Sequence, residues 1–213
     1  MKKGLSIITN FGCDTGCEYC IWKLHKLNSI LTKFNSTDWN SLYRYLKQNS
    51  TKKISISGGG DPFYKYNDNR DWYWILFKIC KKLNIKIDVH TSKIILNNVF
   101  LSKFNKIVLH LNPEDFLIHV NDLLLIPNKK RLVFVINNDL TIDFVNFVNK
   151  FCKTNKIQLS FRELYGFDIS EEAKRVQNYI IENESKSFYK FIKQDDYNIY
   201  FMPNNEFVEK FIG

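Results

Sequence analysis

Short runs of apolar and β-branched residues alternate with longer amphipathic segments along most of this 213-residue chain. Short apolar runs favour buried strands, whereas apolar residues repeated at helical spacing favour helices. The alternation predicts six strand–helix units, and such units build a parallel sheet with helices on its outside. The predicted strands cover residues 3–9, 53–57, 85–91, 106–111, 131–136 and 157–162, and the predicted helices cover 37–48, 70–83, 96–103, 113–125, 141–154 and 170–182.

The last residues differ from this pattern and predict a β-hairpin. Two strand-like runs, 198–202 and 206–211, flank the turn-forming sequence Pro203-Asn204-Asn205. We therefore expect one domain, in which residues 1–167 form the core strands and helices and residues 168–213 add the last helix and the hairpin. The hairpin is also a candidate lid over a reaction site.

Composition and charge narrow the class of protein. Apolar residues make up 45% of the chain, which is ample for one core. No window approaches the roughly 20 apolar residues of a membrane span, and the first residues do not form a signal peptide. A cytoplasmic protein is therefore expected. The net charge of +9 is spread over single lysines, Lys93 and Lys106 among them. This indicates a solvated basic surface and leaves open an anionic substrate or a nucleic-acid partner.

Three of the five cysteines lie close together, as Cys13, Cys17 and Cys20 in the spacing C-x3-C-x2-C after the first predicted strand. The other two, Cys80 and Cys152, lie in apolar helical segments, where thiols behave as small buried hydrophobes. An odd cysteine count argues against a disulfide framework. Three thiolates on one loop can bind a soft metal centre. A structural zinc site wants four protein ligands, whereas a [4Fe–4S] cluster held by three thiolates keeps one iron open.

This spacing, with Tyr19 directly before the third cysteine, resembles the signature of the radical S-adenosylmethionine (radical SAM) enzymes. The resemblance implies an α/β fold, an open partial (βα)6 barrel with the hairpin as a C-terminal extension. It also implies that Cys13, Cys17 and Cys20 ligate a [4Fe–4S] cluster whose open iron binds SAM. In that family the reduced cluster cleaves SAM to a 5′-deoxyadenosyl radical, which abstracts a hydrogen atom from the substrate. Tyr19 would pack near the adenine.

A second segment, Gly58-Gly59-Gly60-Asp61-Pro62, supports the same resemblance because it follows the second predicted strand. The family usually carries a Gly-Gly-Glu-Pro-like sequence there, whose backbone approaches the amino group of SAM. Glycines allow such a close approach. This chain has Asp61 where Glu is more usual, which keeps the charge and shortens the reach.

Further candidates lie at the ends of later predicted strands, where parallel barrels place their active face. His90, Thr91 and Ser92 lie at the end of the third predicted strand, and His110 and Asn112 lie at the end of the fourth. Three residues at these strand ends are candidates to contact SAM, namely Thr91, Asn112 and, after the fifth predicted strand, Asn137. For each of them the alternative is a structural role as a cap or loop residue.

Three residues are candidates to contact substrate, namely His25, Arg162 and Glu163. Adjacent strand residues face opposite ways, so at most one of Arg162 and Glu163 points into the barrel. An inward Arg would suit a carboxylate or phosphate, and an inward Glu would suit an amine or hydroxyl. For His25 the alternative is a solvent-facing side chain with no role in the site.

The resemblance predicts an enzyme that uses an iron–sulfur cluster and SAM on a small-molecule or nucleobase-type substrate. An external one-electron donor of the flavodoxin or ferredoxin type would be required, because no redox domain is evident. Activation of a glycyl-radical enzyme and modification of a peptide are alternatives. A non-catalytic zinc or iron–sulfur protein is a further alternative, which leaves the glycine segment unexplained.

Overall fold

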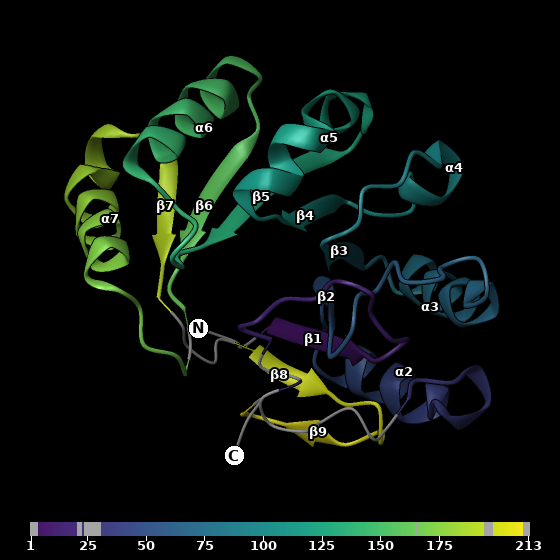
Figure 1. Cartoon of the computed structure of the whole chain (residues 1–213). Helices are drawn as coiled ribbons and strands as arrows, with labels where there is room; N and C mark the ends of the chain where they lie inside the picture. Colours follow the sequence, from purple (N-terminus) through teal and green to yellow (C-terminus); the bar gives the residue numbers. More distant parts are fainter. Residues whose placement is uncertain (1–3, 21–22, 24–30, 165, 194–197, 211–213) are drawn as a thin grey trace.

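The computed structural model describes residues 4–20, 23, 31–164, 166–193 and 198–210. Its strands form one sheet in the order β7-β6-β5-β4-β3-β2-β1-β8-β9. The strands from β7 to β8 run parallel to their neighbours, and β9 runs antiparallel to β8. The sheet curves, and the helices lie along its outer side (Figure 1).

The first six strands and their helices follow the predicted alternation. The strands are β1 (Gly4–Thr9), β2 (Lys53–Gly58), β3 (Lys86–Thr91), β4 (Lys106–His110), β5 (Lys129–Val135) and β6 (Gln158–Arg162). The helices are α2 (Trp39–Gln48), α3 (Arg70–Lys82), α4 (Asn98–Leu101), α5 (Pro113–Leu125), α6 (Ile142–Thr154) and α7 (Glu171–Asn183). The prediction of an open partial barrel with a C-terminal hairpin is confirmed.

The core lies between the sheet and the helices. Alternate strand residues point toward the helices and are buried there, as Ile56, Val89 and Leu109 show. The helices contribute their apolar faces, and Cys80 and Cys152 are both buried among them as predicted. Burial raises the pKa of each of these two thiols to about 12, which keeps them protonated and unreactive.

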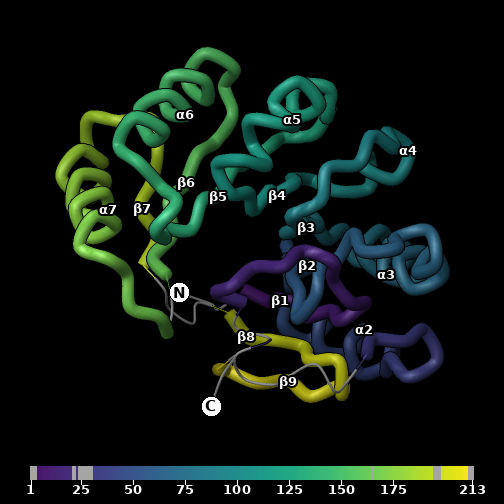
Figure 2. Tube along the Cα trace, viewed as in Figure 1, coloured from purple at the N-terminus to yellow at the C-terminus, as the bar shows by residue number. Residues whose placement is uncertain are grey.

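The last part of the chain departs from the prediction in one respect. A short strand, β7 (Tyr189–Ile192), extends the sheet beyond β6 and was not predicted. The predicted hairpin is present as β8 (Asn198–Phe201) and β9 (Phe207–Val208). Figure 2 shows the trace of this hairpin beside β1 at the other end of the sheet.

Helix α2 begins at Trp39, two residues after the start at residue 37 that the sequence predicted. Asp38 caps the helix by accepting a hydrogen bond from the Ser41 N–H. The Thr37 hydroxyl is engaged elsewhere, since it donates to the Lys33 carbonyl and accepts from the Trp72 indole. Thr37 therefore lies before the helix, and its side chain contacts α3 instead of capping α2.

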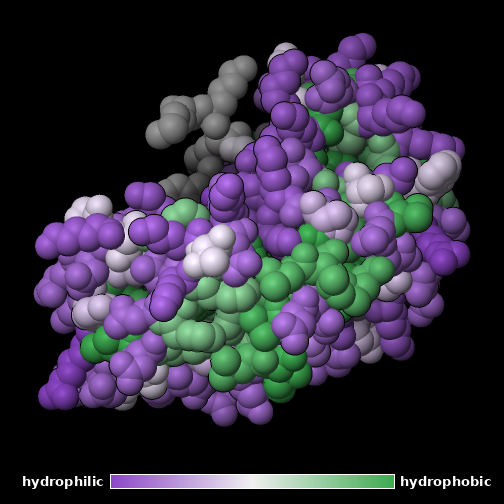
Figure 3. Space-filling model, turned by 90° about the horizontal axis from the view of Figure 1, so that it is seen from above, coloured by the Kyte–Doolittle hydropathy of each residue, from purple (hydrophilic) through white to green (hydrophobic). Residues whose placement is uncertain are grey.

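The outer surface of the helical layer is not uniformly polar. Exposed hydrophobic residues gather on α5, and Figure 3 shows hydrophobic side chains spread across one face of the molecule. Those on α5 are Leu117, Ile118, Leu124 and Leu125. No helix among the described residues is long and apolar enough to cross a membrane.

Candidate functional site

The three-cysteine loop follows β1 at the edge of the sheet where the parallel strands end. Cys13 is exposed, Cys17 and Cys20 are partly buried, and none of the three forms a disulfide. The Thr15 N–H donates to the Cys13 sulfur at 3.3 Å, and the Cys20 N–H donates to the Cys17 carbonyl at 3.3 Å. The three thiols therefore lie on one short segment that local hydrogen bonds help to hold.

The three thiols affect one another electrostatically. Burial raises the pKa of Cys17, and the neighbouring Cys20 and Cys13 raise it further. A group of thiolates is therefore unfavourable until a cation neutralises it, as a metal does. Within the described ranges, no three His, Cys, Asp or Glu side chains converge tightly enough to hold a metal ion. The donor set fits a cluster held by three thiolates, and its binding would be coupled to closure of the loop.

The glycine segment packs directly against this loop. The Gly59 N–H donates to the Thr9 carbonyl at 2.8 Å, and the Asp61 N–H donates to the Gly12 carbonyl at 3.0 Å. A Cβ atom on Gly60 would lie 2.3 Å from the Gly12 carbonyl oxygen. Glycine is required at position 60 because the backbone of the cysteine loop occupies the space of a side chain.

Asp61 is buried and its carboxylate is fully engaged within the protein. Oδ1 accepts from the Phe63 N–H and the Thr91 hydroxyl, both at 2.7 Å. Oδ2 accepts from the N–H and the hydroxyl of Ser92, at 2.6 and 2.8 Å. These bonds connect the end of β2 to the end of β3, and they orient Thr91 toward Asp61.

The end of β3 in turn holds the cysteine loop. The Ser92 and Thr15 hydroxyls lie 3.0 Å apart, and Lys93 Nζ lies 2.7 Å from Asp14 Oδ2. Sequence reasoning missed Asp14, Thr15 and Lys93. The position of Asp14 and Thr15 between Cys13 and Cys17 could have indicated them. Lys93 was interpreted as one of the scattered surface lysines.

Tyr19 extends from the cysteine loop toward two later loops. Its pKa is raised well above the usual value, mainly by burial and then by Cys17, Asp139 and Asp115. Asp115 lies in the first turn of α5 and Asp139 lies between β5 and α6. The charges of the cysteine loop and of the segments after β4 and β5 therefore act on the Tyr19 side chain.

The two asparagine candidates have local structural roles. Asn112 caps α5, where its side-chain oxygen accepts from the Asp115 N–H at 2.7 Å. Asn137 lies in the turn after β5, where its side-chain amide donates to Asp139 at 2.9 Å. Both lie at the same edge of the sheet as the cysteine loop, and contact with SAM stays a prediction for each.

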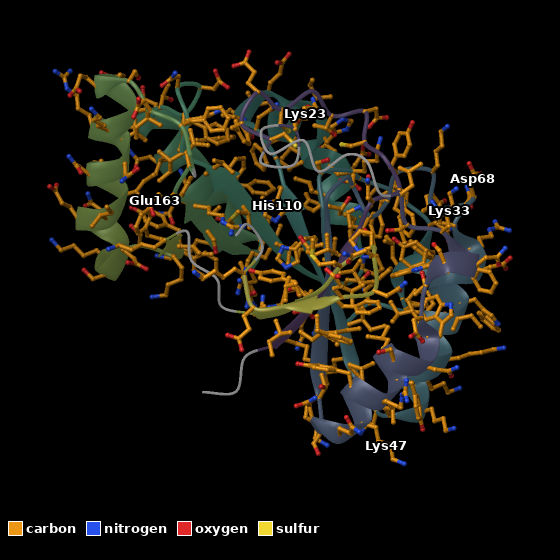
Figure 4. All side chains as sticks on the ribbon, turned by 90° about the horizontal axis from the view of Figure 1, so that it is seen from below. Lys23, Lys33, Lys47, Asp68, His110 and Glu163 are labelled. Atoms are coloured by element: carbon orange, nitrogen blue, oxygen red, sulfur yellow. The ribbon has the colours of Figure 1, made fainter. Side chains whose placement is uncertain are left out.

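The substrate candidates are separated by the structure. Arg162 lies on the inner face of β6, where its charge lowers the pKa of both His90 and His110. Glu163 follows the end of β6, and its N–H donates to the Ile192 carbonyl. Figure 4 shows His110 near the middle of the molecule and Glu163 toward α7. His25 lies outside the described residues.

Comparison with solved structures identifies the class of fold. The chain superposes on Streptococcus suis SuiB bound to S-adenosylmethionine with a TM-score of 0.66 and 14% identity, covering 97% of this chain and 60% of that one. A structure of SuiB bound to its precursor peptide SuiA gives a TM-score of 0.63 at 15% identity, over 99% and 60% of the two chains. A polyhistidine-tagged form of anSMEcpe with bound AdoMet gives 0.66 at 13% identity, over 97% and 74%.

These neighbours carry the fold of the radical SAM enzymes, so this chain has that fold, as its cysteine spacing predicted. The chain spans 60% of the length of the SuiB chains. Neither protein-family models nor curated proteins give a match to the sequence.

Proposed function

We propose that this protein is a radical SAM enzyme that carries a single [4Fe–4S] cluster on Cys13, Cys17 and Cys20. The observation that carries the proposal is the position of these cysteines. They occupy the loop after β1, at the carboxyl edge of a sheet whose solved neighbours bind S-adenosylmethionine. When bound, the cluster would supply the electron that splits the sulfonium bond of SAM, and the carbon radical so released would take a hydrogen atom from the substrate.

The glycine segment is assigned to the methionine part of SAM. The N–H groups of Gly59 and Gly60 donate to the Thr9 carbonyl. The carbonyl oxygens of Gly58 to Gly60 are therefore the groups that we assign to the SAM amino group. Asp61 acts as a positioning residue in this proposal, because its four hydrogen bonds fix the ends of β2 and β3 beside the cysteine loop. Thr91 supports SAM through Asp61.

The adenosine part is assigned to Tyr19 and to the loops after β4 and β5. Partial burial of Tyr19, with Asp115 and Asp139 nearby, supports a site that encloses one side of the nucleoside. Asn112 and Asn137 lie at these loops and can offer hydrogen bonds to the ribose or the carboxylate. An external one-electron donor completes the reaction.

Two substrate classes fit the site. The first is a small molecule or nucleobase, which suits a chain with a single cysteine loop. The second is a peptide, and a specific observation favours it. Solved neighbours were obtained with the precursor peptide SuiA and with the Kp18Cys peptide. Peptide modification is therefore the second candidate function.

Metal analysis of the anaerobically reconstituted protein tests the cluster assignment. We expect iron and acid-labile sulfide in equal amounts, with binding lost in Cys13→Ala, Cys17→Ala and Cys20→Ala and retained in Cys80→Ala. Zinc without sulfide would contradict the proposal and favour a structural metal site. The Cys80 variant is the matched control because that thiol is buried on α3, outside the loop.

A further inference from the structure

The inner face of the sheet carries many polar side chains beside a few buried apolar ones, Ile8, Val108 and Val133, and so much polarity is unusual for a parallel sheet. Residues that share a register position point to the same face, and alternate residues point to opposite faces. The residues that alternate with the helix-facing core therefore line the inside of the curve. Among the described strand residues they include Ser6, Ser55, Asp88, His90, Lys106, His110, Arg131, Gln158, Ser160 and Arg162.

Positive charge dominates this inner face. Asp88 is the single carboxylate at an inward register position among the described residues of β1 to β8. It is already engaged, since Lys53 Nζ lies 3.2 Å from Oδ2 and the Asn105 side-chain amide donates to Oδ1 at 2.7 Å. Arg131 and Arg162 face inward on β5 and β6. The inner face thus has an excess of cations, of which Arg162 lies at the carboxyl end of its strand, β6, whereas Lys106 and Arg131 lie nearer the amino ends of β4 and β5.

Two histidines contact each other within this face. Nδ1 of His90 lies 3.1 Å from Nε2 of His110, so one ring donates its N–H to the other. Burial lowers the pKa of His90 to about 4, with Arg162 as the next cause. Burial also lowers the pKa of His110, followed by His90 and Arg162. The pair is therefore neutral near pH 7, and the charge of Arg162, two strands away from β4 on the same face, acts on both rings.

The charged residues around the pair explain why neither histidine is protonated near pH 7. Asp88 on the same strand favours the imidazolium form of His90, but the cations Lys106 on β4, Arg131 on β5 and Arg162 on β6 oppose it. A neutral imidazole keeps one N–H donor and one acceptor. Two such rings linked together keep a donor available for a third group.

We infer that Arg162 and the His90–His110 pair form an oxyanion-binding subsite, which holds a carboxylate or phosphate group of the substrate inside the barrel. The inference rests on the proposed function, because it names the substrate class for that site. A guanidinium presents paired N–H donors that match both kinds of oxyanion. The histidine pair adds a neutral donor beside it. The pair lies inside the curve formed by β3 and β4, and the cysteine loop lies at the carboxyl edge of the same sheet.

The subsite predicts that binding of an oxyanion takes up a proton. An anion beside the histidine pair favours its imidazolium form and raises its pKa. Proton uptake on binding should therefore increase as the pH falls from neutral toward the pKa of the pair. A site formed only by Arg162 would bind the anion without this uptake.

Calorimetric titration of the reconstituted protein with sulfate tests the inference, because the charge of sulfate is constant across this pH range. Succinate serves as the carboxylate probe. We expect saturable binding that weakens at least about tenfold in Arg162→Gln and only a few-fold in Arg162→Lys. Titrations in buffers of different ionisation enthalpy should show proton uptake in the parent protein, which His110→Gln should reduce and the double substitution of His90 and His110 by Gln should abolish. Arg175→Gln, an exposed change on α7, is the matched control and should bind as the parent does.

Three outcomes would overturn the inference. They are equal binding by Arg162→Gln and the control, no saturable binding by the folded parent, and competition between saturating SAM and sulfate, which would assign the site to the SAM carboxylate. Circular dichroism confirms that each variant is folded. Sulfate binding is measured without turnover. An inactive enzyme that binds sulfate as expected would therefore contradict the proposed function and support the subsite.

Discussion

At the scale of single residues, Asp61 is the centre of the candidate site. Its buried carboxylate accepts from two backbone N–H groups and two hydroxyls, contributed by Phe63, Thr91 and Ser92. A shorter side chain than the usual Glu fits this position because the partners lie directly beside the end of β2. The same hydrogen bonds lead through Ser92 to Thr15 and the cysteine loop.

Asp61→Asn should destabilise the protein by about 2–4 kcal/mol, because an amide NH₂ would face donors where the carboxylate accepted from them. Urea unfolding measures the loss, and cluster loading should fall with it. Asp68→Asn, at an exposed position before α3, is the control and should change stability little. Equal effects of the two substitutions would show that the Asp61 bonds do not hold the site.

The histidine pair predicts an acid-sensitive fold. The pKa of His90 is about 4 in the folded protein against an ordinary 6.5. Between these values the unfolded chain binds more protons, so stability falls as the pH is lowered from 6.5 to about 4. The contribution of His90 is up to roughly 3 kcal/mol. Urea unfolding across this range should show a shallower pH dependence in His90→Gln and an unchanged one in His119→Gln, a substitution on α5. Parallel curves for all three proteins would contradict the assignment.

The sequence predicts the site unevenly at this scale. The cysteines and the glycine segment are recognisable because their spacing is local. The Asp14–Lys93 ion pair and the His90–His110 contact join residues that are far apart in the chain. Only the strand order brings them together, so no local pattern indicates them. Strand alternation predicts that at most one of Arg162 and Glu163 faces inward, but the choice of Arg162 needs the register of β6.

At the scale of elements, the alternation of strands and helices was predictable because each unit has a strong apolar pattern. The missed strand, β7, spans four residues and carries Lys190 in its middle. Such a short run has little periodicity, and its place is set by pairing with β6. The hairpin was predicted from its turn, but its parallel pairing with β1 is a tertiary feature.

This pairing changes how the hairpin should be tested. Because β8 is bonded to β1 in the sheet, deletion of residues 198–213 would expose the edge of the strand that leads to the cysteine loop. The turn also holds the start of α2, since Asn205 accepts from the Asp38 N–H at 2.8 Å and donates to the Ser36 carbonyl at 2.7 Å. A role as a lid stays a prediction that deletion alone does not test.

Asn205→Ala should lower stability by about 1–2 kcal/mol. The substitution removes both hydrogen bonds and places Ala at a backbone φ of 70°, where Asn is better tolerated. Thermal unfolding measures the loss. Asn204→Ala is the neighbouring control, because the Asn204 side chain bonds to the exposed Glu206 within the turn. A larger loss in the control than in Asn205→Ala would refute the proposed attachment of the hairpin to α2.

At the scale of the whole molecule, the distribution of charge matters more than its total. In the sequence, the net charge of +9 indicates lysines that are scattered over the surface. The fold separates these cations into an outer set on the helices and an inner set on the strands, which includes Lys106, Arg131 and Arg162. A parallel sheet with an apolar outer face and a basic inner face is suited to hold a charged substrate inside the barrel.

In the proposed function, the loop of Cys13, Cys17 and Cys20 supports reductive cleavage of SAM. The most direct measurement is anaerobic: reconstituted protein is incubated with dithionite and SAM, and 5′-deoxyadenosine is quantified by mass spectrometry. We expect the parent protein to form 5′-deoxyadenosine and Cys17→Ala to form none. Equal product from Cys17→Ala, or none from a parent protein with a full cluster, would show that the cysteine loop does not support this reaction.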